Sequence, residues 1–299
     1  MRAIAALLAV LFVYCSTLEV VTCLGLARIS RIQRRLDDDY RAAGSLRPEV
    51  PGDPPTILFA GNSLLLAAVD RSLLQKELAP NYHLAMLPVE NTQYEDWYFG
   101  LRRLFAEGSR PSVVVVCLSM RQLISHATDG EYFAHYLMQE HDLLAVKRES
   151  QIDNTMTSNY FFANQSRWLG NRAHIRNWLL QEIMPNLDQL IGFFPGNAPT
   201  LPPDVVFTHG LPHLRKMDEL CRANRARFLL VVPPTLNLHD DSAVLQNAAT
   251  REGITVLIPA RPGELGPDDF RDGSHMNQQG AAQFTGRLGP VLLQALSSR

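Results

Sequence analysis

Ile57-Leu58-Phe59-Ala60-Gly61-Asn62-Ser63 places four apolar residues before a Gly-Asn-Ser corner, and three leucines follow it. The pattern predicts a buried parallel strand that ends in a tight turn carrying one hydroxyl. Ligands of open α/β sheets lie at the carboxyl ends of the strands, so Ser63 is a candidate for chemistry. A serine after a strand is more often a helix N-cap, and its role therefore depends on its partners.

The length and composition predict one sizeable hydrophobic core and argue against several classes of function. The chain has 299 residues, of which 46% are hydrophobic, and this length does not argue for two full domains. Its net charge of −2 gives no basis for nucleic-acid binding. The cysteines show no disulfide framework or zinc knuckle and are expected to be free thiols: Cys15, Cys23, Cys117 and Cys221.

Apolar runs alternate with amphipathic segments after residue 55. Strands are expected at 56–60, 82–89, 113–118, 228–232 and 254–258, and helices at 69–78, 96–107, 211–224, 242–252 and 278–296. Asp70 is placed to cap the helix at 69–78. Gly289-Pro290 is expected to break or restart the last helix. The alternation predicts right-handed crossovers and a flavodoxin-like three-layer sandwich with a parallel sheet of about five strands.

The alternation of strands and helices is interrupted between about residues 125 and 206. We interpret this segment as a helical cap inserted into the domain 56–299. A structureless loop of that length is improbable in a compact domain. Helical patterns are plausible at 131–148 and 168–191. The aromatic side chains of the insert either line a substrate groove or pack its own core, and core packing is favoured.

The N-terminal residues 1–27 predict a transmembrane anchor, followed by a helical stalk and linker at 28–55. About 20 apolar residues span a bilayer, and no short apolar region with a clear cleavage site is present. Glu19 lies toward the end of the run, where it can approach the interface. The arginines that follow place the main domain in the cytoplasm by a positive-inside count: Arg28, Arg31, Arg34 and Arg35.

A base for Ser63 is present near the other end of the chain. A serine nucleophile needs an adjacent base, which works best when a third group orients it. Asp272 and His275 lie three residues apart after the last expected strand. In a 2-1-3-4-5 strand order these groups share one sheet edge with Ser63, so a serine, a histidine and an aspartate can meet there.

Gly61-Asn62-Ser63 and Asp272-Gly273-Ser274-His275, in this order and context, resemble the motifs of the SGNH (GDSL-like) hydrolase superfamily. The resemblance covers about 56–299 and leaves the insert unmatched. It looks closest to membrane-anchored members that handle acyl groups on cell-envelope polymers. It implies an extracytoplasmic main domain, against the positive-inside count. It also implies an acylated polysaccharide or small acyl ester as substrate and a membrane acyltransferase as partner.

The resemblance has gaps on the oxyanion side. Asn91-Thr92-Gln93-Tyr94 lacks the Gly that the family usually has after strand two, and no Asn follows the third expected strand. Only the backbone N–H of Ser63 carries over, so Asn91 or Arg121 is a candidate for a second donor. The alternative is that Arg121 forms an ion pair with a surface carboxylate, Glu90 or Glu95. The sequence favours neither role of Arg121 over the other.

We therefore expect a membrane-anchored serine esterase or O-acyltransferase that acts on an acylated envelope glycan, with acetyl as the expected acyl group. Ser63 is the expected nucleophile, His275 the base and Asp272 the group that orients the base. The alternative is an inactive glycan-binding or scaffold protein that kept the fold. No cofactor or metal is implied. His209 and His213 are four apart, but Gly210 and Pro212 disfavour a helical metal pair, so these histidines are assigned to the surface or the cap.

Overall fold

A computed structural model describes residues 2–48, 52–183, 203–236 and 241–298 of the chain. It comprises two compact units, each described here by itself. Unit 1 contains residues 1–38 and 129–193, and unit 2 contains residues 39–128 and 194–299. The expected anchor and most of the expected insert thus belong to one unit. The sheet and both candidate motifs belong to the other.

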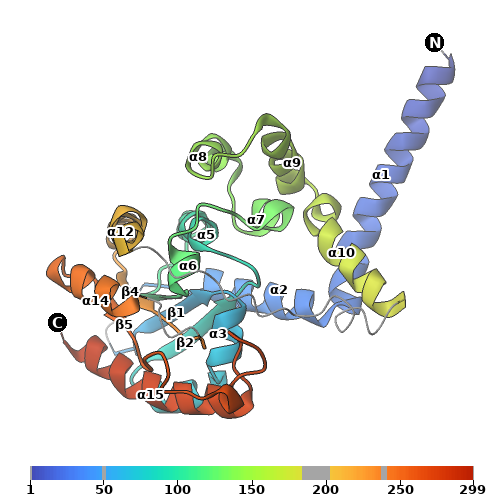
Figure 1. Cartoon of the computed structure of the whole chain (residues 1–299). Coiled ribbons are helices and arrows are strands. Elements are labelled where there is room, and N and C mark those ends of the chain that lie inside the picture. Colours follow the sequence, from blue (N-terminus) through green and yellow to red (C-terminus); the bar gives the residue numbers. More distant parts are fainter. Residues whose placement is uncertain (1, 49–51, 184–202, 237–240, 299) are drawn as a thin grey trace. The chain divides into compact units, whose positions relative to one another are not determined.

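Unit 2 is built on a parallel sheet of five strands in the order β2-β1-β3-β4-β5 (Figure 1). The flavodoxin-like sandwich expected from the sequence is confirmed, with strand ends within about two residues of those expected. The strands are β1 (Thr56–Gly61), β2 (His83–Pro88), β3 (Val113–Cys117), β4 (Arg227–Val231) and β5 (Thr255–Leu257). Their residues are buried almost throughout because helices cover both faces of the sheet.

One helix layer packs α3, α4 and α15 on the face that carries Ile57, Phe59 and Val115, and the other layer includes α5 and α13. The helices of unit 2 are α3 (Ser63–Ala68), α4 (Arg71–Leu78), α5 (Tyr94–Ala106), α6 (Met120–Leu123), α12 (Pro203–Val205), α13 (Leu211–Ala223), α14 (Ser242–Arg251) and α15 (Gln278–Ser297). A π-helical turn, η2 (Val206–Gly210), and a 3₁₀ turn, η3 (Pro267–Asp269), complete the unit.

Two local expectations of unit 2 have different outcomes. Asp70 caps α4 as expected, since its carboxylate accepts from the N–H of Leu73 at 3.0 Å. The expected break at Gly289-Pro290 is wrong, because α15 continues through Pro290. Its buried leucines, on both sides of the proline, hold the helix against the sheet, and this burial offsets the one hydrogen bond that proline removes.

Gly61, the last residue of β1, is required by the close approach of the next strand. A Cβ at this position would lie 2.6 Å from the carbonyl oxygen of Cys117. No side chain fits there without moving the backbone of β3. The glycine before the Asn-Ser corner therefore allows β1 and β3 to pair to their ends.

Unit 1 contains α1 (Arg2–Ile29), the first part of α2 (Arg31–Gly44), α7 (Gly130–Tyr136), η1 (Glu140–Asp142), α8 (Leu143–Glu149), α9 (Asn154–Gln165) and α10 (Arg167–Ile183). The last eight residues of the helix expected at 168–191 lie outside the described residues. Phe133 and Tyr160 are fully buried against each other, which supports core packing for those aromatics, whereas Phe161 and Phe162 are exposed.

Helix α1 is long and apolar enough to cross a membrane, and none of its most apolar window is buried. A signal sequence would satisfy the same test. Glu19 of this helix caps α10, because its carboxylate accepts from the Oγ of Ser166 at 2.6 Å and from the N–H groups of Arg167 at 2.8 Å and Trp168 at 3.2 Å. The one acidic residue of the apolar run is thus hydrogen-bonded within unit 1.

The segment expected as stalk and linker, 28–55, is helical for half its length. The last part of α2 packs on unit 2, where Ala43 is fully buried and its carbonyl accepts from the Oγ of Ser109 at 2.7 Å. Asp39, also buried, pairs with Arg71 at 2.7 Å. Part of the expected linker is therefore a covering helix of the α/β unit.

Candidate functional site

Ser63 lies at the point where β1 becomes α3, on the carboxyl edge of the sheet. It is the first residue of α3 and is partly buried, and Asn62 before it is the N-cap. The N–H groups of the first helical turn have no partner inside the helix and carry the positive end of its dipole. The serine hydroxyl and its own N–H are therefore presented together at the end of β1.

His275 connects Ser63 to Asp272. Its Nε2 lies 2.8 Å from the Oγ of Ser63, and its Nδ1 lies 2.9 Å from one carboxylate oxygen of Asp272 and 3.2 Å from the other. A carboxylate at Nδ1 holds the proton on that nitrogen, so Nε2 is left to accept the serine proton. The structure thus brings together, over 212 residues of chain, the three side chains singled out in the sequence.

The loop that carries Asp272 and His275 is itself fixed at both sides. Phe270 and Met276 form an isolated antiparallel bridge, and the N–H of Arg271 donates to the carbonyl of His275 at 2.8 Å. The N–H groups of Ser274 and His275 both donate to one oxygen of Asp272 at 2.8 Å. The backbone therefore positions the carboxylate before it meets the imidazole.

These contacts also set the ionisation of Asp272. Burial opposes the charged form, but the N–H groups of His275 and Ser274 and the His275 side chain donate to the carboxylate and lower its pKa below the ordinary 3.8. Asp272 is therefore a carboxylate at neutral pH. Its side chain retains 25% exposure and that of His275 23%, so solvent reaches the pair.

The side chain of Asn62 makes two hydrogen bonds that hold the corner in place. Its Oδ1 accepts from the N–H of Leu64 at 2.9 Å, and its Nδ2 donates to the carbonyl of Thr92 at 2.8 Å. An aspartate can make only the first of these bonds. The amide, fully buried, thereby ties the start of α3 to the segment after β2. The sequence analysis missed this link, because its acceptor is a backbone carbonyl on a separate segment and leaves no pattern in the sequence.

The structure leaves the predicted oxyanion donors in different settings. Asn91 is exposed and has φ +61°, a left-handed conformation that asparagine tolerates, between β2 and α5. Arg121 is exposed in the short helix α6 that follows β3. Both follow strands that flank β1, at the carboxyl edge. Glu95, one of the two surface carboxylates named as partners for Arg121, is only 2% exposed and is not a surface residue.

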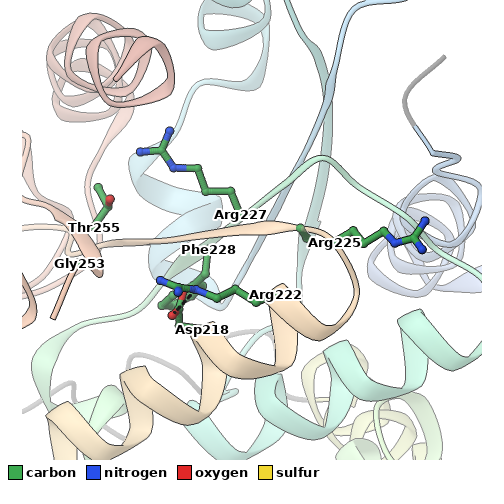
Figure 2. A pocket seen from close by; sticks show the side chains of 8 residues that line it. Asp218, Arg222, Arg225, Arg227, Phe228, Gly253 and Thr255 are labelled. Carbon is green, nitrogen blue, oxygen red and sulfur yellow. Dashed lines mark ion pairs between the residues drawn. The ribbon is translucent and has the colours of Figure 1, made fainter. Parts of the chain in front are cut away.

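A pocket of unit 2 lies away from Ser63. It is bounded by the starts of β4 and β5, at the amino edge of the sheet, with Arg227 and Thr255 among its lining residues (Figure 2). Arg222, also in its wall, pairs with Asp218 at 2.7 Å. A pocket at the amino edge is opposite to the end of β1 that carries Ser63, so it does not contain the Ser63, His275 and Asp272 group.

Comparison with known proteins gave two negative results and a set of structural similarities. No family model and no curated protein matches the chain. The structural matches include the crystal structure of TesA, with 15% identity over 79% of this chain and 97% of that chain and a TM-score of 0.39. They also include a lipolytic protein of the G-D-S-L family from Veillonella parvula, with 10% identity over 80% and 98% of the two chains and a TM-score of 0.41.

At these identities and TM-scores, the similarities say nothing about the reaction of this chain. Unit 2 itself has the 2-1-3-4-5 parallel sheet expected from the sequence, with the Ser63 corner after β1 and the Asp-x-x-His loop before α15.

Proposed function

We propose that the protein is a serine-dependent esterase or O-acyltransferase. The observation that carries the proposal is the continuous contact from Asp272 through His275 to Ser63, with 2.9 Å and 2.8 Å between the bonded atoms. A serine hydroxyl becomes a useful nucleophile when a positioned base takes its proton. The arrangement is suited to acyl transfer through a covalent serine ester.

In the first half-reaction, the Oγ of Ser63 attacks the acyl carbonyl while Nε2 of His275 takes the hydroxyl proton. The tetrahedral intermediate collapses as His275 returns that proton to the departing alkoxide, which leaves as an alcohol. In the second half-reaction, water or a sugar hydroxyl gives its proton to His275 and attacks the acyl-serine. Collapse restores the Ser63 hydroxyl and releases an acid or a new ester. Asp272 stabilises the imidazolium throughout.

The developing oxyanion needs donors besides the N–H of Ser63. We assign the second donor to Asn91 or Arg121, the groups that follow the two strands beside β1. Removing one oxyanion donor typically lowers turnover about 10²- to 10³-fold, so these groups are expected to matter less than the base and more than a surface residue.

We place the enzyme at a membrane, with α1 retained as an anchor. The support is the cap that Glu19 provides for α10, because loss of α1 would leave three donors of unit 1 without this carboxylate. The proposed substrate class is an acylated, in particular acetylated, envelope glycan on the extracytoplasmic side, and a membrane acyltransferase is the proposed partner. Both follow from the sequence resemblance.

Steady-state hydrolysis of p-nitrophenyl acetate by the full chain in detergent tests the activity. The proposal predicts turnover that Ser63→Ala abolishes and that Ser72→Ala, a change of an exposed serine on α4, leaves intact. Equal rates for Ser63→Ala and wild type would contradict it. Addition of a sugar acceptor, with mass analysis of acylated product, separates transfer from hydrolysis.

A second candidate function is a catalytically inactive glycan-binding protein of an envelope assembly. The absence of the family's Gly and Asn after β2 and β3 favours it. This function predicts glycan binding without any acyl-serine. The enzyme, in contrast, is expected to carry an acyl group on Ser63 when it is mixed with an activated ester and the reaction is rapidly quenched.

A further inference from the structure

A second group of histidines and a carboxylate lies in unit 2 and shares no residue with the Ser63 group. Glu95 is in the first turn of α5, His126 follows α6, and His213 is in the first turn of α13. One potential ligand atom from each residue lies within 4.8 Å of the others. Since α5 and α6 follow strand ends and α13 precedes β4, all three lie toward the carboxyl edge of the sheet.

The distances match those of ligands around one metal ion. An oxygen of Glu95 lies 3.4 Å from Nδ1 of His126 and 4.0 Å from Nε2 of His213. Ligand atoms about 2.0–2.1 Å from a tetrahedral Zn²⁺ are roughly 3.4 Å apart. The Glu95–His126 separation equals this spacing and the Glu95–His213 separation is about 0.6 Å longer, so the three atoms would draw closer together around one ion.

Both histidines use their other ring nitrogen in the manner of metal ligands. Nδ1 of His213 lies 2.7 Å from the carbonyl of Leu123, and a carbonyl accepts only, so Nδ1 carries the proton. Nε2 of His126 lies 3.2 Å from Nδ1 of His209, a residue of the π-helical turn η2. Metal-bound histidines are held by such outer contacts, which fix the tautomer and ring orientation.

The tautomer of His213 suits this residue to bind a cation beside Glu95. With its proton on Nδ1, His213 turns a lone pair on Nε2 toward a carboxylate that is only 2% exposed. A cation between Nε2 and this carboxylate would be bound by both groups.

We infer that Glu95, His126 and His213 bind one divalent cation of borderline softness, best matched by Zn²⁺, with His209 positioning His126. Two imidazoles and one carboxylate are a ligand set that zinc accepts, with a fourth position left for water. The His126 side chain is 39% exposed, which gives the ion a path to the site. The inference does not depend on the role of Ser63.

The test uses the full chain in detergent, which is stripped with a chelator, dialysed, incubated with Zn²⁺ and desalted. Mass spectrometry then measures the metal content, and competition with a chromogenic chelator measures the affinity. One zinc per chain is expected. His209→Ala is expected to weaken binding about 10- to 100-fold, as loss of an outer contact does, and Glu95→Gln, His126→Ala and His213→Gln to weaken it more.

Two controls make the result specific. His83→Ala removes an exposed histidine from β2, and Ser63→Ala removes the nucleophile; both should hold one zinc with unchanged affinity. Cobalt substitution adds a readout free of activity, because tetrahedral Co²⁺ absorbs strongly in the visible and Glu95→Gln should change that spectrum. Because His126 is partly exposed, we expect His126→Ala to fold, so it tests the site even if the buried substitution His213→Gln prevents folding. Circular dichroism checks the fold of each variant.

A wild-type chain that retains no stoichiometric zinc after desalting would overturn the inference. Zinc retained equally by wild type, His126→Ala and Glu95→Gln would also overturn it, because the ion would then be held elsewhere.

Discussion

The two histidine–carboxylate groups of unit 2 contain the same residue types in opposite surroundings. Around Ser63, Asp272 and His275 are each about one quarter exposed, and the backbone donates two N–H groups to the carboxylate. Around Glu95, the carboxylate is 2% exposed and His213 is 4% exposed. The first group keeps a charged acid beside a base that solvent and substrate can reach.

The difference shows how surroundings select chemistry for the same side chains. An ionised, solvated Asp–His pair can take up and return a proton without leaving a bare charge in the interior. A buried carboxylate that faces the lone pair of a neutral imidazole is instead suited to hold a cation. The comparison therefore predicts that changes in one group alter proton transfer and changes in the other alter metal binding.

The largest expected effect comes from removing the nucleophile. Ser63→Ala should lower kcat for p-nitrophenyl acetate by about 10⁶-fold, the scale of loss when a triad serine is removed, because His275 contacts no other hydroxyl oxygen among the described residues. Stopped assays against a no-protein blank measure it. A kcat within tenfold of wild type would separate this serine from the chemistry.

Asp272→Asn should lower kcat by about 10⁴-fold, because the amide no longer holds the productive tautomer of His275. Asp268→Asn changes an exposed carboxylate in the same loop region and serves as the matched control. Both variants should retain zinc as the wild type does. If Asp268→Asn lost as much activity as Asp272→Asn, the effect would belong to the loop rather than to the carboxylate.

These two sites differ in how far the sequence could predict them. Asp272 and His275 share one loop, and Ser63 ends an apolar strand, so spacing and strand order were enough. Glu95, His126 and His213 come from three segments, each with an ordinary local pattern, and Glu95 was taken for a surface carboxylate. Only tertiary packing brings them together, and no periodicity in the sequence records it.

The same reasoning explains the outcome for the fold. Runs such as Val113–Cys117 are apolar at every position, which is typical of strands covered on both faces, and all five strands were found. Pro290 was misjudged because its local cost is visible in the sequence, whereas the burial of Leu288 and Leu292 that offsets it is not. The tie from Asn62 to Thr92 was missed for the same reason.

The oxyanion side should show intermediate effects. Either Arg121→Ala or Asn91→Gly should lower kcat about 10²- to 10³-fold with little change in KM, because the interaction forms with the developing negative charge. Glycine at position 91 keeps the left-handed backbone, so the variant tests the side chain alone. Unchanged kcat in both variants would remove these residues from the mechanism.

Asn62→Asp should destabilise the α/β unit by about 1–3 kcal/mol, because the buried carbonyl of Thr92 loses its donor and faces a carboxylate oxygen instead. Thermal unfolding compared with Asn247→Asp, an exposed position on α14, measures the effect. An equal midpoint for the two variants would show that the Asn62 amide does not stabilise the corner.

The smallest expected effect is on stability in acid. The pKa of Asp272 is lower in the folded chain than its ordinary 3.8, so on acidification the unfolded chain binds this proton first. The stabilisation from this group is present above that value and is lost as pH falls through the lower, folded pKa. The free energy of unfolding, measured with urea, should fall less steeply from pH 6 to pH 3 in Asp272→Asn than in the wild type. The same dependence on pH in both proteins would contradict this.

Labelling with a fluorophosphonate probe tests most directly whether His275 activates Ser63. The probe phosphonylates a serine in proportion to its reactivity, and peptide mass spectrometry locates the adduct. We predict labelling at Ser63 in the wild type and none in His275→Ala at the same probe concentration and folded content. No adduct on well-folded wild type, or an adduct at Ser63 that survives His275→Ala undiminished, would contradict the proposed mechanism.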